Sequence, residues 1–407
     1  MRYLARSARA HLLPAPPKPL LVCFSHLRWS FVWQRPQHLL SRAAREYRVL
    51  FVEEPVYAQV TGPSLDLSAG PGAITIVAPI LPEHMKGSAG PAAHQSLLDA
   101  LIEDMAAPEM VSWYYTPMAL EYSHHVEANV CVYDCMDELS AFRGASPDMR
   151  QREQQLFRSA HVVFTGGQSL YEAKRSRHPN VHCFPSSIDV PHFKQARHIT
   201  ADPTDQAAIP RPRIGFFGVL DERLDTDLVA ALADANPQWQ LVMIGPLAKI
   251  EAADLPRRPN IHWLGGKSYE ELPAYMSGWE AGFMPFALNE ATRFISPTKT
   301  PEFLAAGLPV VSTPVRDVVK MYGEGGYVEI ADGAPHMSEK LQILLQRPRE
   351  PWLERVDLLL ATMSWDSTWE AMSQEINKLR TQRTRPTARP HPAEDVEAAV
   401  AGKLSRV

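Results

Sequence analysis

The sequence lacks three features that would place it in a special class. Its four cysteines do not form the paired CxxC spacing of a zinc site, so we expect reduced core thiols in a cytosolic protein. No apolar run reaches the roughly 18 residues of a membrane span. The net charge of -5 argues against a general nucleic-acid-binding protein. The cysteines are Cys23, Cys131, Cys135 and Cys183.

The composition is that of a soluble globular protein with room for two domains. Apolar residues make up 45% of the 407 residues and charged residues 21%. Residues 1–18 are basic, but their apolar part is too short for a signal peptide and ends at proline. They predict a flexible arm or, alternatively, a weak anchor for peripheral membrane association. Residues 381–407 are rich in Arg and Pro, which predicts a disordered tail.

Short apolar runs alternate with helical patterns through the first half of the chain. Continuous apolar strands separated by helices are typical of a parallel sheet that is covered on both faces. The pattern predicts a Rossmann-like domain over residues 19–193. Its expected strands cover residues 19–25, 48–54, 73–79, 110–116, 128–135 and 161–165, and its expected helices cover residues 36–47, 93–106 and 147–159.

A polar, proline-rich segment over residues 194–212 has no period, which predicts a linker. The alternation then restarts and predicts a second Rossmann-like domain over residues 213–360, followed by a closing helix over 361–380. Ligands of such α/β sheets bind at the carboxyl ends of the strands, so we expect these ends to face a shared cleft. The expected strands cover residues 213–220, 239–245, 261–265, 281–286, 308–313 and 327–331.

One stretch, "SPTKTPEFLAAGLPVVSTP" over residues 296–314, places two charges at the mouth of an apolar run. Ser296 or Thr300 suits the cap of a short helix, and Gly307 suits its end. The run "LPVVST" that follows predicts a buried strand. The charged residues therefore lie in the first turns of a helix, where free N–H groups favour an anion.

Lys299 and Glu302 are the two charges in this stretch. A lysine at a helix N-terminus adds a cation for a phosphate, and a glutamate can accept two hydrogen bonds from a vicinal diol such as ribose. The alternative is that Glu302 only complements the helix dipole and Lys299 is solvated. Gly218 and Arg223, which follow the first strand of the same domain, would meet them at one face of the cleft.

The order of motifs in the second domain resembles the C-terminal domain of GT-B glycosyltransferases of the bacterial group 1/group 4 kind. The motifs are "IGFFGVL", "LVMIGP", "NIHWLGGKSYEELPAYMSGWEAGFMPF" and "SPTKTPEFLAAGLPVVST". In the first domain, "CFSHLRWSFVWQRPQHLLSRAA" and "VYDCMDELSAF" resemble a subfamily associated with exopolysaccharide and teichuronic-acid assembly. The resemblance covers residues 19 to 380. It implies two Rossmann-like domains that face each other across a cleft, with the acceptor in the first domain and the donor in the second.

The resemblance also implies roles for individual residues. Glu302 matches the second Glu of the family's E-x7-E motif, the ribose ligand, and Lys299 lies where diphosphate contacts are common. The first Glu of that motif is replaced by Phe294, and the family's Gly-Arg pair is Gly218-Val219 here, so Arg223 must substitute or the contact is lost. The implied donor ligands are Gly218, Arg223, Ser296, Lys299 and Glu302.

A catalytic base is expected from the first domain, across the cleft. His26 follows the first strand, where inverting GT-B enzymes often place a catalytic His, and Asp137 follows the strand that ends near Asp134. A His is the easier base near neutral pH, whereas an Asp needs burial to raise its pKa. Alternatively, His26 is a polar loop residue and Asp137 caps a helix.

The loop "RWSFVWQRP" interleaves aromatic residues with arginines. Trp29 and Trp33 offer faces for a sugar ring, and Arg28 and Arg35 suit a phosphate. The alternative is a packed loop with a buried Trp.

The "DTD" triplet of Asp225 and Asp227 matches a metal-binding Asp-x-Asp motif, but it opens a predicted helix, where Asp is a natural cap. We therefore predict a metal-independent reaction without a cofactor beyond the donor.

The sequence predicts a glycosyltransferase that moves a sugar from a nucleotide diphosphate sugar, most simply a UDP-sugar, to a saccharide or lipid-linked acceptor in surface polysaccharide synthesis. One alternative is a nucleotide-sugar epimerase of the same architecture. A second alternative, which the departures at Phe294 and Val219 motivate, is a non-catalytic sugar-nucleotide-binding partner.

Overall fold

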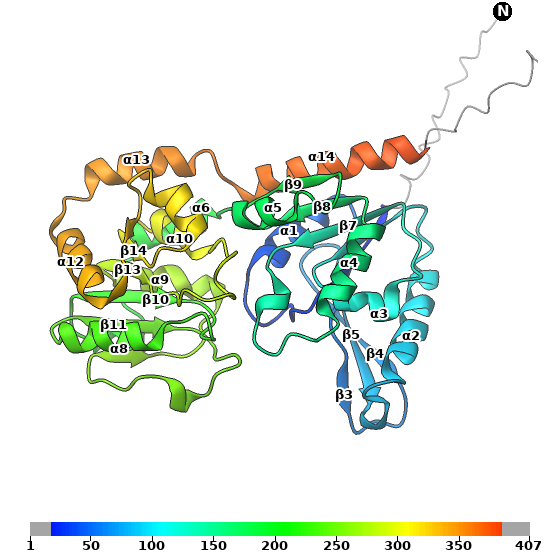
Figure 1. The fold of residues 1–407 in the computed structure, drawn as a ribbon, viewed down its shortest axis with the longest axis horizontal. Coiled ribbons are helices and arrows are strands. Elements are labelled where there is room, and N and C mark those ends of the chain that lie inside the picture. Colours follow the sequence, from blue (N-terminus) through cyan, green and yellow to red (C-terminus); the bar gives the residue numbers. More distant parts are fainter. Residues whose placement is uncertain (1–17, 385–407) are drawn as a thin grey trace, which may run out of the picture.

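A computed structural model describes residues 18–384, which form two α/β halves, each built on its own sheet (Figure 1). The predicted arm over residues 1–18 lies outside the described residues except for Lys18. The predicted tail over 381–407 lies outside them except for residues 381–384, which are the last residues of helix α14 (Trp365–Thr384). Within the described part of the chain, no helix is long and apolar enough to cross a membrane.

The first half contains a nine-stranded sheet in the order β3-β5-β2-β1-β6-β7-β8-β9, with β4 paired to β5. All pairs are parallel except β4 with β5, so the prediction of a parallel sheet is confirmed for its centre. The strands are β1 (Leu20–Phe24), β2 (Arg48–Val52), β3 (Val56–Ala58), β4 (Ser64–Ala69), β5 (Ile74–Pro82), β6 (Met110–Tyr114), β7 (Val130–Cys135), β8 (Val162–Thr165) and β9 (Val181–Cys183).

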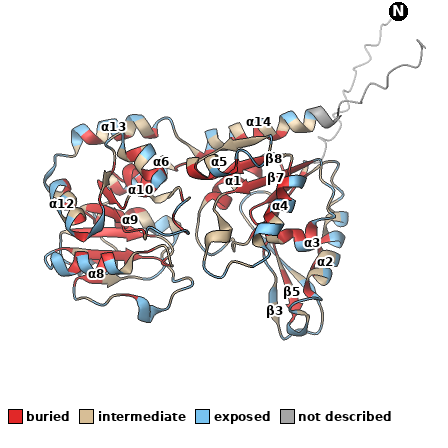
Figure 2. Ribbon diagram, in the orientation of Figure 1, coloured by how far each residue is buried: buried red, intermediate tan, exposed pale blue. Residues whose placement is uncertain are grey.

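Helices cover both faces of this sheet because alternate strand residues point to opposite sides. One apolar cluster joins Leu21, Phe51 and Trp113 to the face that carries α1 and α14. The other joins Leu20 and Tyr133 to the face of α2, α3 and α4. Figure 2 shows the strands as the buried centre of each half. The helices are α1 (Arg35–Ala43), α2 (Gly90–Met105), α3 (Leu120–Ser123), α4 (Met149–Ser159) and α5 (Gln168–Lys174).

The second half contains a six-stranded, entirely parallel sheet in the order β12-β11-β10-β13-β14-β15. Its strands are β10 (Arg213–Phe217), β11 (Gln240–Ile244), β12 (Ile261–Trp263), β13 (Ala281–Met284), β14 (Val310–Ser312) and β15 (Glu329–Ile330). Its helices are α8 (Thr226–Ala235), α9 (Leu272–Ser277), α10 (Lys299–Ala305), α11 (Arg316–Val318), α12 (Gly333–Gln346) and α13 (Glu350–Leu360).

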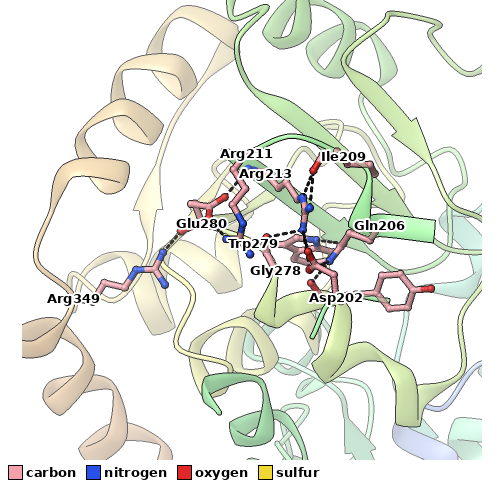
Figure 3. A network of polar contacts seen from close by, with 10 residues as sticks. Asp202, Gln206, Ile209, Arg211, Arg213, Gly278, Trp279, Glu280 and Arg349 are labelled. Carbon is pink, nitrogen blue, oxygen red and sulfur yellow. Dashed lines mark hydrogen bonds and ion pairs between the residues drawn. The ribbon is translucent and has the colours of Figure 1, made fainter. Parts of the chain in front are cut away.

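The predicted linker over residues 194–212 is packed against the second half rather than free. Short helices α6 (Val190–Lys194) and α7 (Thr204–Ala207) lie at and within it, and Ile209 is buried in the core of the second half. Figure 3 shows that the buried Arg213 guanidinium donates to Asp202 and to the Ile209 carbonyl. Asp202 and Gln206 of this segment make hydrogen bonds to buried groups of the second half, so part of the predicted linker is packed.

The chain returns to the first half after α13. Trp365 and Trp369 of α14 pack in the cluster around Trp113, so the last described helix closes the sheet of the first half (Figure 1). The carboxyl ends of the parallel strands in both sheets are followed by the loops that line one shared cavity. The position predicted for the cleft is therefore the position of the candidate site.

Candidate functional site

A cavity of about 410 Å³ lies between the two halves, at the carboxyl ends of their central strands. This is where open α/β sheets bind ligands. The first half contributes the loop after β1 and the residues after β7. The second half contributes the turns after β10, β11 and β12 and the start of α10. Six of the seven predicted site residues line the cavity, namely Asp137, Gly218, Arg223, Ser296, Lys299 and Glu302; His26 does not.

Gly218 forms a bare turn directly beneath Lys299. Its φ of +135° lies in the region that favours glycine, and a Cβ atom there would stand 1.8 Å from Lys299 Cε. Gly245 at the end of β11 is equally constrained, since its Cβ would lie 1.7 Å from the Gly218 carbonyl oxygen. Two neighbouring strands thus end in glycines so that the lysine side chain can cross the backbone and a ligand can approach it.

Helix α10 begins at Lys299, with Thr298 at the N-cap, and the Thr298 side chain makes no capping hydrogen bond. The prediction of Ser296 or Thr300 as the cap is therefore wrong. The helix starts after Ser296, and the Thr300 hydroxyl instead donates to Met284 Sδ at 3.5 Å. The predicted end is confirmed, because Gly307 follows the helix with a φ of +78°. At the start of α10 the Thr300 N–H donates to the Pro297 carbonyl at 3.3 Å and Pro301 has no N–H, so of the first three helix residues only Lys299 has a backbone N–H left for a ligand.

The two charges of this stretch are largely withdrawn from solvent: Glu302 is buried and Lys299 is half-buried. Among the described residues, neither the Lys299 ammonium nor the Glu302 carboxyl has a hydrogen bond or an ion pair. Burial raises the pKa of Glu302 to about 7, against the opposing effect of the Lys299 charge. Burial and the nearby Arg223 charge lower the pKa of Lys299. Such groups cost stability, which is the usual mark of a ligand site.

Arg223 reaches the cavity wall but already has a partner. Its guanidinium binds the Asp221 carboxylate in bidentate fashion, with Nε–Oδ1 at 2.9 Å and Nη2–Oδ2 at 2.6 Å. It also lies over the Phe142 ring of the first half, 5.3 Å from the centroid. Arg223 therefore has only part of its donors free for a diphosphate. The neighbouring Asp221 is visible in the sequence "DER", and its spacing of two residues could have indicated this pair.

Asp137 is a carboxyl poised to titrate near neutral pH. Glu138, not Asp137, occupies the N-cap of the short helix that follows, so Asp137 is not a cap. Its carboxyl makes no hydrogen bond within the described residues. Burial raises the pKa of Asp137 to about 6, although Arg223 and Lys299 across the cavity lower it. A carboxyl of this kind can accept a proton from a sugar hydroxyl.

His26 lies beside the cavity rather than in its wall. Its Nδ1 atom is buried and has no partner among the described residues. Burial and the charge of Lys249 lower the pKa of His26 to about 4, so the imidazole is neutral at physiological pH. A group with such a pKa is a weaker base than Asp137. The two candidates that the sequence left open therefore differ in placement, since Asp137 lines the cavity and His26 does not.

The arginines of the aromatic loop are engaged in ion pairs. Arg28 bonds Glu53 at 2.8 Å, and the buried Arg35 holds Asp134 with Nη2–Oδ1 at 2.8 Å. The prediction that Arg35 is available for a phosphate is therefore wrong, because a carboxylate 99 residues away takes its donors.

The aromatic residues of this loop both pack and line the cavity. The ring of Trp29 contacts Phe51 edge to face, and the ring of Trp33 lies 5.8 Å from Tyr269 of the second half. Both tryptophans are also part of the cavity wall. The two readings of the loop, a packed element and a ligand surface, therefore both apply.

The "DTD" triplet is a helix cap, as predicted: the Asp225 carboxylate accepts a hydrogen bond from the Leu228 backbone at 2.8 Å at the start of α8. In residues 18–384, no group of three or more His, Cys, Asp or Glu side chains is arranged to hold a metal ion.

Further contacts between the halves involve residues that the sequence did not single out. The Asp317 carboxylate accepts from the Ser169 backbone at 3.0 Å, and Glu222 accepts from the Arg143 backbone at 3.1 Å. Tyr269 packs against the first half from the loop after β12. The one sequence signal for Tyr269 is its position in "GGKSYEEL", directly after the capping-box residue Ser268.

Residues 211–347 match the family model described as "Glycosyl transferases group 1". A sequence relative, the Bacillus subtilis (strain 168) protein TuaH, is named as a glycosyltransferase of teichuronic acid biosynthesis. It is 29% identical over 158 residues, which are 38% of this chain and 40% of the relative. The chain thus matches less than half the length of that relative.

Solved structures resemble nearly the whole chain. Sucrose-phosphate synthase from Thermosynechococcus elongatus superimposes with a TM-score of 0.66 at 14% identity, covering 90% of this chain and 100% of that structure. Anabaena HepE in complex with UDP gives a TM-score of 0.61 at 14% identity, covering 89% and 100%. The likeness establishes the predicted GT-B fold.

Proposed function

We propose that this chain, whose residues 211–347 form a group 1 glycosyltransferase domain, transfers a sugar from a nucleoside diphosphate sugar to a saccharide or lipid-linked acceptor. The observation that carries the proposal is the unpartnered Lys299 and Glu302 pair, which lies in the cavity between the halves beside the bare Gly218 turn. A lysine and a carboxylate together complement the diphosphate and the ribose of a sugar nucleotide.

The donor binds the second half. The Lys299 ammonium neutralises the diphosphate, with Gly218 and Ser296 beside it. Glu302 accepts hydrogen bonds from the ribose. Arg223 contributes those donors that Asp221 leaves free. Because these groups can stabilise the leaving diphosphate, the proposal requires no metal ion and no cofactor beyond the donor.

The acceptor binds the first half, and Asp137 is the proposed base. The acceptor hydroxyl oxygen forms a bond to the anomeric carbon, its proton passes to the Asp137 carboxylate, and the bond from that carbon to the diphosphate oxygen breaks. The pKa of about 6 suits this task near neutral pH. Enclosure between the halves keeps water from the donor. His26 is the second candidate base.

A UDP-sugar is the donor that we propose, and surface polysaccharide synthesis is the proposed setting. HepE, which has the same fold, was solved with UDP, and TuaH is named for teichuronic acid biosynthesis. A cytoplasmic donor would place the protein in the cytoplasm. A lipid-linked acceptor would bring it to the inner face of the membrane.

A second candidate is a sugar-nucleotide-binding protein without catalysis. Two observations support it: Phe294 stands in place of the family's first Glu, and Asp221 occupies part of the guanidinium of Arg223, the arginine expected to replace the family's missing one.

Acceptor-dependent release of nucleoside diphosphate separates these possibilities. Nucleotide sugars are first screened for a thermal shift, and those that bind are incubated with acceptor glycans, with the Glu302→Gln variant as control. We expect release only with donor and acceptor together. Binding without turnover for every acceptor favours the second candidate, and failure to bind any nucleotide sugar contradicts both.

A further inference from the structure

Tyr269 lies where the two halves of the molecule meet and lines the cavity. It opens the short helix η6 (Tyr269–Glu271), where the Ser268 backbone donates to the Glu271 carboxylate at 2.9 Å. This capping box fixes the backbone conformation at the start of the helix, where Tyr269 is the first residue. The position of the residue is therefore set by its own local sequence.

The ring of Tyr269 is held from several sides. It stacks on His192 with the centroids 4.1 Å apart and the planes at 11°, and Phe193 contacts it edge to face at 5.5 Å. From the first half, Trp33 lies at 5.8 Å and His38 at 5.6 Å. A ring packed in this way cannot swing its hydroxyl elsewhere without disturbing both halves.

The hydroxyl group itself is unused. It is buried and has no hydrogen-bond partner among the described residues, whereas the Tyr275 hydroxyl, two turns along the same segment, bonds Asp205 at 2.7 Å. After burial, the charge of Glu302 is the largest influence that raises the pKa of Tyr269. Independently of that charge effect, Tyr269 and Glu302 line the same cavity.

A buried phenol without a partner is costly, since a phenylalanine would fill the same space without that cost. The two neighbouring groups also differ in chemistry. An ionised Glu302 can only accept hydrogen bonds, whereas a tyrosine hydroxyl can donate one. A vicinal diol has protons to donate and lone pairs to fill, so a carboxylate and a phenol together satisfy it better than the carboxylate alone.

We propose that Tyr269 is a second ribose-binding residue, whose hydroxyl donates a hydrogen bond to a ribose hydroxyl group of the donor while Glu302 accepts from the same diol. This inference rests on the proposed function and deepens it. Because Trp33 and His38 of the first half hold the Tyr269 ring, the first half also contributes to donor binding, without touching the nucleotide through its own polar groups.

Titration calorimetry of the full chain with the Tyr269→Phe variant tests the proposal. The ligands are UDP, its 2′-deoxy and 3′-deoxy analogues, and inorganic pyrophosphate. We expect the variant to bind UDP about tenfold more weakly, the scale of one lost hydrogen bond. We expect no change for pyrophosphate. For one of the two deoxy analogues, wild-type and variant proteins should bind equally, because the hydroxyl that Tyr269 contacts is absent.

The Tyr275→Phe variant is the matched control, since it removes a phenol hydroxyl of the same segment that bonds Asp205. It should leave UDP affinity unchanged. A Tyr269→Phe variant that loses equal affinity for UDP and for both deoxy analogues overturns the inference, because the ring alone would then matter. The inference is also overturned if the wild-type protein binds UDP and the Tyr269→Phe variant binds it with the same affinity. If wild-type protein binds no nucleoside diphosphate, the proposed function fails with it.

Discussion

Arg35 of the first half and the Lys299 and Glu302 pair of the second half line the same cavity but differ in their partners. In the first half, Arg35 forms an ion pair with Asp134, and Arg28 forms one with Glu53. In the second half, Lys299 and Glu302 stand at the cavity with no partner in the described residues. The comparison teaches that an arginine in a site-like motif can serve the fold, while an unpaired buried charge is the better sign of a ligand.

The largest expected effect tests the structural side of this comparison. Arg35→Met should lower the free energy of unfolding by about 3–5 kcal/mol, because it leaves the buried Asp134 carboxylate unpaired. Lys299→Met should cost much less stability than Arg35→Met, because the half-buried ammonium makes no hydrogen bond or ion pair within the described residues. Urea denaturation measures both. Equal losses in the two variants would contradict the distinction between paired and unpaired charges.

Asp137 is the one acidic residue of the first half that we assign to catalysis. Asp137→Asn should lower kcat about 10²–10⁴-fold, the usual contribution of a general base. Donor affinity should change little, because the second half holds the donor. Initial rates with a verified acceptor and donor titrations measure the two quantities. His26→Ala is the matched comparison and should retain most of kcat; the reverse ranking would make His26 the base.

The pH dependence sharpens the same assignment. A base must be deprotonated, so activity should rise with pH through about 6, the pKa of Asp137. The linkage to stability has the opposite sign. The folded state binds the Asp137 proton more tightly than the unfolded state, so this group's contribution favours folding at low pH and weakens as pH rises through 6. Rate profiles and thermal unfolding between pH 5 and 8 check both directions.

Glu302→Gln should weaken donor binding by about 1–3 kcal/mol, the scale of a lost hydrogen bond to a charged group. Burial gives Glu302 a pKa of about 7, so wild-type affinity for a nucleoside should rise as pH increases through 7, and the variant should show no such rise. Calorimetry at pH 6 and 8 measures this. An identical pH response in the two proteins would remove Glu302 from the ribose site.

The smallest effect is expected at Arg223, because Asp221 already takes part of its guanidinium. Arg223→Ala should weaken binding of a nucleoside diphosphate less than Lys299→Ala does, and neither should alter binding of the nucleoside alone. A larger loss at Arg223 would mean that the Asp221 pair opens when the donor binds.

The candidate site was partly predictable. The residues of the second half are brought together by turns after successive parallel strands, and strand periodicity reveals that arrangement. The sequence could not show that Ser296 precedes the helix, that Asp134 holds Arg35, or that Tyr269 lines the same cavity as Glu302. Each of these depends on side-chain packing at a junction, where local propensity has little influence.

The sequence by itself determined the local features of this protein: the alternation of strands and helices, the end of α10 at Gly307, the Asp225 cap, and a group 1 glycosyltransferase pattern in the second half. Only the tertiary structure decided which polar groups are satisfied. Arg35 and Asp134 are 99 residues apart, and a crossover connection brings them to 2.8 Å. Contacts between residues so far apart in the sequence depend on the tertiary fold. The same holds for the packing of residues 194–212 on the second half and of α14 on the first half.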